Sequence, residues 1–193
     1  MTSNNKILPK FQCLDIPVDK IPLKLLHNDT EIVKNTLLST IPVLPKEYEI
    51  SFDFKATKWP SGWTSILHFS KQADSGWGNR IPAILTYSGK VFISNAIDGN
   101  ANWNFYGLRF ELNTWVNFRL SQRLEGHKYM YRVYLDGYLM KEKINRRAED
   151  FHQVDIWIGD NSRIAQPGFI KNLYISGKYK VLFSVAFYCK LKL

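Results

Sequence analysis

Apolar and polar residues alternate along much of the chain. In residues 47–55, EYEISFDFK, the apolar positions Tyr48, Ile50, Phe52 and Phe54 are separated by polar or charged residues. Successive side chains of a β-strand point to opposite faces of a sheet, so this alternation predicts a half-buried strand. We therefore expect one face of this segment to lie in a hydrophobic core.

The same alternation recurs as far as residue 176, and turn residues separate the segments. We expect strands in residues 63–70, 81–87, 90–96, 115–122, 129–135, 138–144, 154–160 and 169–176. Asp136-Gly137 suits a type I′ hairpin turn, and Ser88-Gly89 and Asp98-Gly99 also read as turns. No helical stripe of twelve residues and no fixed-period repeat interrupts the series. This predicts an all-β fold, an antiparallel β-sandwich (jelly roll) of two packed sheets with roughly ten strands or more.

The chain divides into a central domain and two flanks. Residues 1–45 carry five prolines and predict an irregular N-terminal extension, with or without an early strand at 36–41 that joins the sandwich. Residues 46–176 form the predicted jelly-roll domain, and residues 177–193 a basic tail or terminal strand. One domain with tails is the organisation expected for 193 residues.

The formal net charge of +9 lies to a large extent in the flanks. Such charge attracts sulfated polyanions, nucleic acid or anionic lipid, but no run of five or six like charges marks a binding arm. We expect the densest basic segment, residues 141–147 (KEKINRR), to be a solvated loop rather than a polyanion site. Aromatic residues that alternate on strands belong to a core, so we expect no nucleic-acid partner.

The sequence bears on the compartment only weakly. Residues 1–12 lack the apolar stretch of a signal peptide, and no run approaches the ~20 apolar residues of a membrane span. We expect an extracellular or cell-surface protein in mature form, with an intracellular one as the alternative. Cys13 and Cys189 lie near opposite ends and either pair or remain free thiols; neither has the spacing of a metal or redox motif.

Three stretches carry a resemblance to a known family. They are residues 113–122 (NTWVNFRLSQ), 131–140 (YRVYLDGYLM) and 156–176 (IWIGDNSRIAQPGFIKNLYIS). The marked positions in them are Trp115, Asp136, Gly137, Gly159, Asp160, Gly168, Ile170, Asn172 and Leu173. This pattern resembles the concanavalin A-like lectin/glucanase superfamily, and most closely its laminin G-like and pentraxin-like domains. It covers about residues 46–176 and implies the architecture rather than an activity.

Because that superfamily includes glycoside hydrolases, a pair of catalytic carboxylates has to be considered. Glu47, Glu49 and Asp53 lie on one face of the predicted strand, but Ser51 stands where the E-x-D-x-x-E pattern of laminarinase-like hydrolases needs an aspartate. The four histidines are dispersed, and no G-x-S-x-G motif is present. We therefore expect no enzyme, with a glycoside hydrolase as the lesser alternative.

Two segments, residues 73–80 and residues 98–106, combine aromatic and amide side chains as sugar-binding loops do. The candidate ligand-binding residues are Trp77, Asn79, Arg80, Asn100, Asn102, Trp103, Asn104 and Tyr106. Laminin G-like and pentraxin-like domains also imply calcium, for which the weak candidates are Asp74, Asp98 and Asp160. We expect a lectin-like module for a glycan, a glycoprotein or an extracellular-matrix ligand; the alternative is a protein-interaction or adhesion module without a sugar site.

Overall fold

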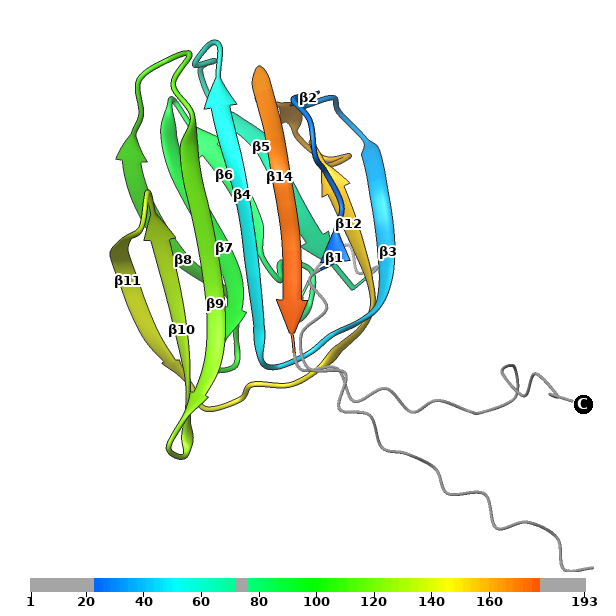
Figure 1. Cartoon of the computed structure of the whole chain (residues 1–193), viewed down its shortest axis with the longest axis vertical. Coiled ribbons are helices and arrows are strands. Elements are labelled where there is room, and N and C mark those ends of the chain that lie inside the picture. The colour runs from blue at the N-terminus through cyan, green and yellow to red at the C-terminus, as the bar shows by residue number, and fades with distance from the viewer. Residues whose placement is uncertain (1–22, 72–75, 178–193) are drawn as a thin grey trace, which may run out of the picture.

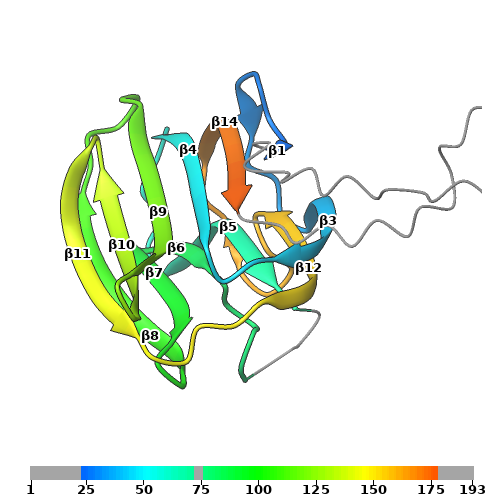
Figure 2. The same ribbon diagram turned by 60° about the horizontal axis from the view of Figure 1, so that its bottom comes forward.

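The computed structural model describes residues 23–71 and 76–177. These residues form fourteen β-strands and no helix. The strands build two sheets that pack face to face, as the two ribbon views show (Figures 1 and 2). The prediction of an all-β sandwich with two packed sheets is confirmed.

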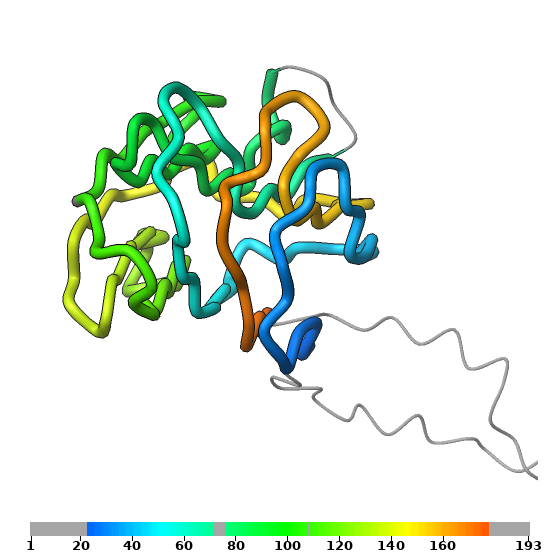
Figure 3. The backbone as a smooth tube through the Cα atoms, turned by 90° about the horizontal axis from the view of Figure 1, so that it is seen from above, coloured from blue at the N-terminus to red at the C-terminus, as the bar shows by residue number. Residues whose placement is uncertain are grey.

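The first sheet, which we call sheet I, has the strand order β1-β14-β4-β9-β10-β11, with β2 also paired to β14. Its strands are β1 (Leu23–Lys24), β2 (Thr30–Glu31), β4 (Tyr48–Ala56), β9 (Val116–Glu125), β10 (Lys128–Leu135), β11 (Tyr138–Asn145) and β14 (Gly168–Gly177). All its pairings are antiparallel. The first and last described strands, β1 and β14, lie side by side (Figure 3).

The second sheet, sheet II, has the order β3-β12-β5-β6-β7-β8, with β13 paired to β5. Its strands are β3 (Thr36–Leu44), β5 (Trp63–Ser70), β6 (Ala83–Tyr87), β7 (Lys90–Ile97), β8 (Asn100–Arg109), β12 (Phe151–Ile158) and β13 (Ile164–Ala165). Only the two-residue β13 pairs in parallel among these described strands. Strands that lie far apart in the chain are therefore neighbours in space.

The core lies between the two sheets, and β4 shows why. Tyr48, Ile50, Phe52 and Phe54 are all buried, as their alternation with polar residues predicts. Phe52 lies opposite Phe118 of β9, and their rings stack at a centroid distance of 5.0 Å. Burying a large apolar side chain stabilises the fold by about 1.5–3 kcal/mol. The alternating pattern thus fixes which face of each strand points inward.

Three of the described hairpins turn on the dipeptides that the sequence singles out. Asp136 and Gly137, between β10 and β11, have φ angles of 47° and 82°. Ser88-Gly89 and Asp98-Gly99 likewise have positive φ at both residues. A type I′ turn requires this geometry, and its twist matches that of the strands it joins.

The N-terminal flank contributes to both sheets. The early strand expected at 36–41 is present as β3, which extends to Leu44 and pairs with β12 at the edge of sheet II. The short strands β1 and β2 pair with β14 in sheet I. Cys13 and Cys189, whose pairing the sequence leaves open, lie outside the described residues.

Two segments expected to be loops are strands instead. The basic residues 141–145 belong to β11, which bears out the strand expected at 138–144, and only residues 146 and 147 of the expected loop form a turn. The amide-rich residues 100–106 lie in β8, the edge strand next to β7. Hydrogen bonding to β7 and the inward packing of Trp103 and Phe105 outweigh the low strand propensity of asparagine here.

We predict that Gly168→Ala destabilises the protein more than Gly62→Ala does. A Cβ at Gly168 would clash with the backbone carbonyl oxygen of Lys55 on the paired strand, where nothing flexible can give way. Gly62 also has a positive φ, 82°, but nothing lies within 4 Å of its added Cβ. Urea unfolding should show a loss of about 3 kcal/mol or more at Gly168 against about 1–2 kcal/mol at Gly62. Equal losses would contradict the clash.

Candidate functional site

The outer face of sheet II carries a groove formed by two adjoining hollows of about 600 and about 470 Å³. Arg80, Ser162 and Arg163 line both hollows, so the hollows meet at these residues. The larger one is also lined by His68, Ser70, Asn79, Asp155, Trp157, Asp160 and Asn161. The smaller one is also lined by Trp63, Leu85 and Phe92. We call the two hollows together the sheet II groove.

Strand alternation explains which side chains reach the groove. On β12, Val154 and Ile156 are buried in the core, so Asp155 and Trp157 point to the opposite face. A small apolar cluster separate from the main core shows the same outward orientation on β6 and β7: Ala83, Leu85 and Phe92.

A β-bulge brings His68 into the groove. Simple alternation would place His68 on the same face as Ile66, which is how the sequence reads. The pairing of β5 with β6 shifts register between Ser65 and Leu67, so that Ile66 lies in the core while His68 lines the groove. His68 is largely buried, and its Nε2 lies within hydrogen-bonding distance of the carbonyl oxygen of Asn79.

Asp160 is the buried anion of the groove, with a side chain only 2% exposed. Its carboxylate accepts hydrogen bonds from the backbone N–H of Ser162 at 3.0 Å and of Arg163 at 2.8 Å. The guanidinium of Arg163 donates to it at 2.9 Å, and Nδ1 of His68 lies 3.5 Å away. Nε2 of His68 lies 2.5 Å from the carbonyl oxygen of Asn79. One carboxylate therefore fixes the loop, the arginine and the histidine.

These contacts decide the charge of Asp160. Burial acts to raise the pKa of its carboxyl group, but the hydrogen bonds from His68 and the Arg163 backbone, with the charge of Arg163, hold the pKa well below its usual value. Asp160 is thus ionised at neutral pH and forms a partly buried ion pair with Arg163.

Arg80 faces the same groove with different partners. Its Nη1 donates to Oδ1 of Asn102 at 2.8 Å. Within the part of the chain that the structure describes, no carboxylate lies within 4.0 Å of the Arg80 guanidinium, whereas Arg163 has Asp160. Burial and repulsion by Arg163 lower the pKa of Arg80, and only the more distant Asp160 opposes them. The groove therefore holds a partly buried cation without an anionic partner among the described residues.

An aromatic ladder crosses the outer face of sheet II beside the arginines. Trp63 contacts Tyr87 and Phe92 at centroid distances of 4.9 and 4.8 Å, and Phe92 contacts Tyr106 at 4.8 Å. Three of these rings are exposed, Trp63 by 42%, Tyr87 by 50% and Tyr106 by 71%. Exposed aromatic rings that lie next to one another on a sheet face mark an interaction site.

The structure brings about half of the sequence-predicted binding residues to this region. Asn79 and Arg80 line the groove, and Tyr106 belongs to the aromatic ladder. Asn102 holds Arg80, and its own N–H donates to Oδ1 of Asn100 at 2.9 Å.

The remaining candidates serve other contacts. Trp77 donates its indole N–H to Glu149 and packs against Phe151 at a centroid distance of 6.1 Å. Trp103 points into the core, where its ring meets Tyr131 edge-on at 5.7 Å. Neither tryptophan lines the groove. Asn104 is exposed on β8, opposite Ser94 of β7.

The calcium candidates do not form a cluster. The carboxylate of Asp98 accepts hydrogen bonds from the backbone N–H and the guanidinium of Arg146, at 3.1 and 2.8 Å. Asp160 is held by Arg163, and Asp74 lies outside the described residues. Residues 23–71 and 76–177 contain no group of three or more His, Cys, Asp or Glu side chains that could hold a metal ion.

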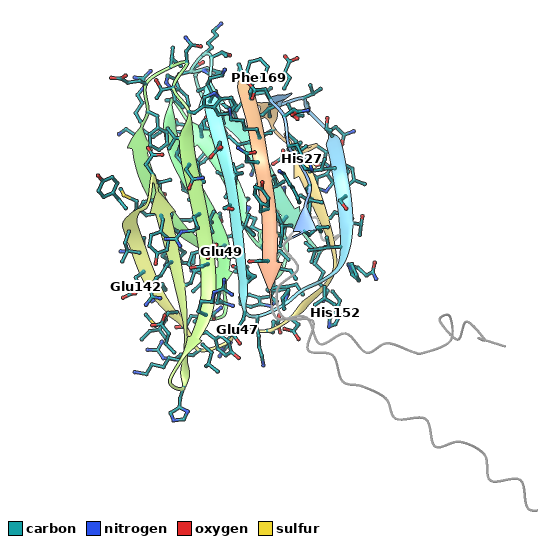
Figure 4. All side chains as sticks on the ribbon, in the orientation of Figure 1. His27, Glu47, Glu49, Glu142, His152 and Phe169 are labelled. Carbon is teal, nitrogen blue, oxygen red and sulfur yellow. The ribbon has the colours of Figure 1, made fainter. Side chains whose placement is uncertain are left out.

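The carboxylates considered for catalysis do not line the groove. Glu49 is on the outer face of sheet I, and Glu47 precedes β4 (Figure 4). Asp53 alternates with the buried Phe52 and Phe54 and so lies on the same outer face as Glu49. Glu49 lies 3.4 Å from Arg123, and Asp53 accepts hydrogen bonds from the side chains of Asn117 and Asn172.

Sequence reasoning missed most of the groove residues, among them Trp63, His68, Trp157 and Arg163. Two of these positions carried a detectable signal, because Trp157 alternates with buried isoleucines on β12 and Trp63 opens a predicted strand next to a turn. Arg163 carried none, since its role depends on how the loop after β12 folds around Asp160.

We predict that Asp160 makes the stability of the protein depend on pH in the acid range. Its depressed pKa means that the folded state binds its proton less readily than the unfolded state does. The stabilisation that ionised Asp160 contributes is thus complete above the usual aspartate pKa. It is lost as the pH falls toward the pKa that Asp160 has in the folded protein. In urea unfolding between about pH 5 and about pH 2, Asp160→Asn should show a flatter decline than wild type. Asp155→Asn, a groove carboxylate without an arginine partner in the described chain, is the control; equal slopes for wild type and Asp160→Asn would refute the prediction.

Comparison with known proteins identifies the fold but no close relative. No protein-family model and no curated protein matches the sequence. No helix in the described residues is long and apolar enough to cross a membrane.

Solved structures of binding domains are among those that share the fold. The ligand-binding domain of botulinum neurotoxin serotype D, in complex with N-acetylneuraminic acid, superposes with a TM-score of 0.54 at 15% identity over 80% of this chain and 40% of that one. A heptameric SAP-like pentraxin from Limulus polyphemus gives 0.51 at 15% identity, over 81% and 75%. The CBM40 of a Ruminococcus gnavus IT-sialidase, bound to α2,3 sialyllactose, gives 0.51 at 12% identity, over 80% and 92%.

The extent and degree of these similarities limit what they establish. This chain spans less than half the length of the toxin domains, and the identities are low. Such likeness shows the architecture, which is the one that the sequence pattern implied. The chain has the concanavalin A-like jelly-roll fold.

Proposed function

We propose that the chain is a non-enzymatic, lectin-like module that binds a glycan in the sheet II groove. The observation that carries the proposal is the groove itself, in which the exposed ring of Trp63 lies beside polar and charged side chains. A sugar ring offers an apolar face and a rim of hydroxyl groups, so a site for it needs both kinds of surface.

The two hollows provide these surfaces separately. Trp63, Leu85 and Phe92 give the smaller hollow an apolar wall on which a sugar face can stack. His68, Ser70 and Asn79 give the larger hollow hydrogen-bonding groups for hydroxyls. Solved structures of this fold that are named for a bound sialic acid or sialyllactose support a glycan as the ligand class.

The chemistry of the groove favours binding over hydrolysis. A glycosidase needs one carboxyl group that gives up a proton and a second that acts as nucleophile or base. Asp160 is held ionised and is only 2% exposed, and Asp155 accepts a hydrogen bond from Thr40 at 2.6 Å. Asp160 is therefore not suited to donate a proton to a glycosidic oxygen.

We predict that the purified chain binds a subset of a mixed glycan array and that Trp63→Ala reduces this binding at least about tenfold, because a stacking face is lost. Tyr138→Ala is the matched control: this tyrosine is 75% exposed but lies on β11 of sheet I, so its removal should leave binding unchanged. EDTA should not abolish binding, since Asp98 and Asp160 are engaged by arginines.

Three outcomes would count against the proposal. Absence of binding to every glycan would favour the protein-interaction alternative. Equal losses in Trp63→Ala and Tyr138→Ala would place the ligand elsewhere. Turnover of any glycan on the array would overturn the non-enzymatic assignment.

A further inference from the structure

The charges in the sheet II groove do not balance locally. The Asp160 carboxylate interacts with both Arg163 and His68, so its negative charge is already compensated. Arg80 adds a second guanidinium close enough to Arg163 for the two to repel each other. The other groove carboxylate, Asp155, lines only the larger hollow and accepts a hydrogen bond from Thr40.

A partly buried Arg80 guanidinium without a carboxylate partner among the described residues costs free energy. A cation that is partly withdrawn from water loses hydration, and a nearby like charge adds to the cost. Among the described residues its guanidinium donates to an amide oxygen, that of Asn102, which compensates a charge less well than a carboxylate would. An anionic ligand beside Arg80 would replace the hydration that the guanidinium has lost. The groove therefore favours an acidic ligand over a neutral ligand of the same shape.

We propose that the glycan bound in the sheet II groove carries a carboxylate, as uronic and sialic acids do, and that Arg80 and Arg163 hold this group where the two hollows meet. This inference rests on the proposed function and specifies its substrate class. A carboxylate suits the position because guanidinium groups present paired N–H donors that match its two oxygens.

The position of the arginines also orients the sugar. Arg80 and Arg163 line both hollows, so an acid group held by them has Trp63 on one side and Ser70 with Asn79 on the other. The apolar face of the acidic sugar then rests on Trp63, and the hydroxyls of the ring or of the next sugar point toward the larger hollow. Asn102 keeps Arg80 pointing into the groove.

The test compares ligands that differ only in charge. Isothermal titration of the full chain would use sialyllactose, its methyl ester and lactose, together with a glucuronic acid disaccharide and a sulfated lactose. We expect at least one carboxylate sugar to bind about tenfold or more tighter than its uncharged counterpart, because charged hydrogen bonds are lost in the ester. Comparing sialyllactose with the glucuronic acid disaccharide shows which carboxylate sugar the groove binds. Tighter binding of the sulfated or the neutral sugar would overturn the inference.

Variants locate the effect on Arg80. In Arg80→Gln the acid and its ester should bind equally, and Arg80→Lys should restore only part of the difference, because lysine lacks the paired donors. Arg146→Gln is the control: it removes the same charge from an exposed arginine that pairs with Asp98, and it should keep the wild-type preference. A preference that survives Arg80→Gln would contradict the assignment. Thermal unfolding checks that each variant folds.

Failure of this inference differs from failure of the proposed function. If the glycan array finds only neutral ligands and these still depend on Trp63, the groove binds sugar but the acidic class is wrong. If no glycan binds, the proposed function itself is wrong.

Discussion

Burying the Asp160 carboxylate costs free energy unless hydrogen bonds and positive charge compensate it, and the site is organised by that compensation. The backbone of residues 162 and 163 curls around its oxygens, Arg163 pairs with it, and His68 is held between Asp160 and the carbonyl of Asn79. One carboxylate thus ties the loop after β12 to β5 and to the segment before β6. Because Arg163 and His68 already engage it on its own side, it leaves Arg80 with only an amide among the described residues.

The fold was predictable because it depends on a local property, the alternation of side chains between two faces. β4 and β9 bury every second residue, and Phe52 meets Phe118 as alternation requires. β8 escaped prediction because its amide-rich composition is typical of loops, while what makes it a strand is non-local pairing with β7. Its own alternation, with Trp103 turned inward and Tyr106 outward, was nevertheless present in the sequence.

The site was less predictable because the order of strands in sheet II differs from their order in the chain. Trp63, Arg80 and Arg163 are far apart in sequence and become neighbours only because β12, β5 and β6 lie side by side. Composition alone identified Asn79 and Arg80, which stand in an aromatic and amide segment. The same criterion selected Trp77, whose indole is bound by Glu149. Residue type indicates a sugar-binding surface only when the face of the strand is known as well.

The two outer faces of the sandwich differ in a way that bears on function. On sheet I several described cations have partners within the protein: Arg132 pairs with Glu125 and Glu142, Arg123 with Glu49, and Lys171 with Asp29 while it also covers the ring of Trp115. A guanidinium that is already paired in this way gains little from an anionic ligand. Sheet II instead exposes a row of aromatic rings and a guanidinium without a carboxylate partner among the described residues. A surface that leaves favourable interactions unmade within the protein is the one where a ligand adds the most free energy.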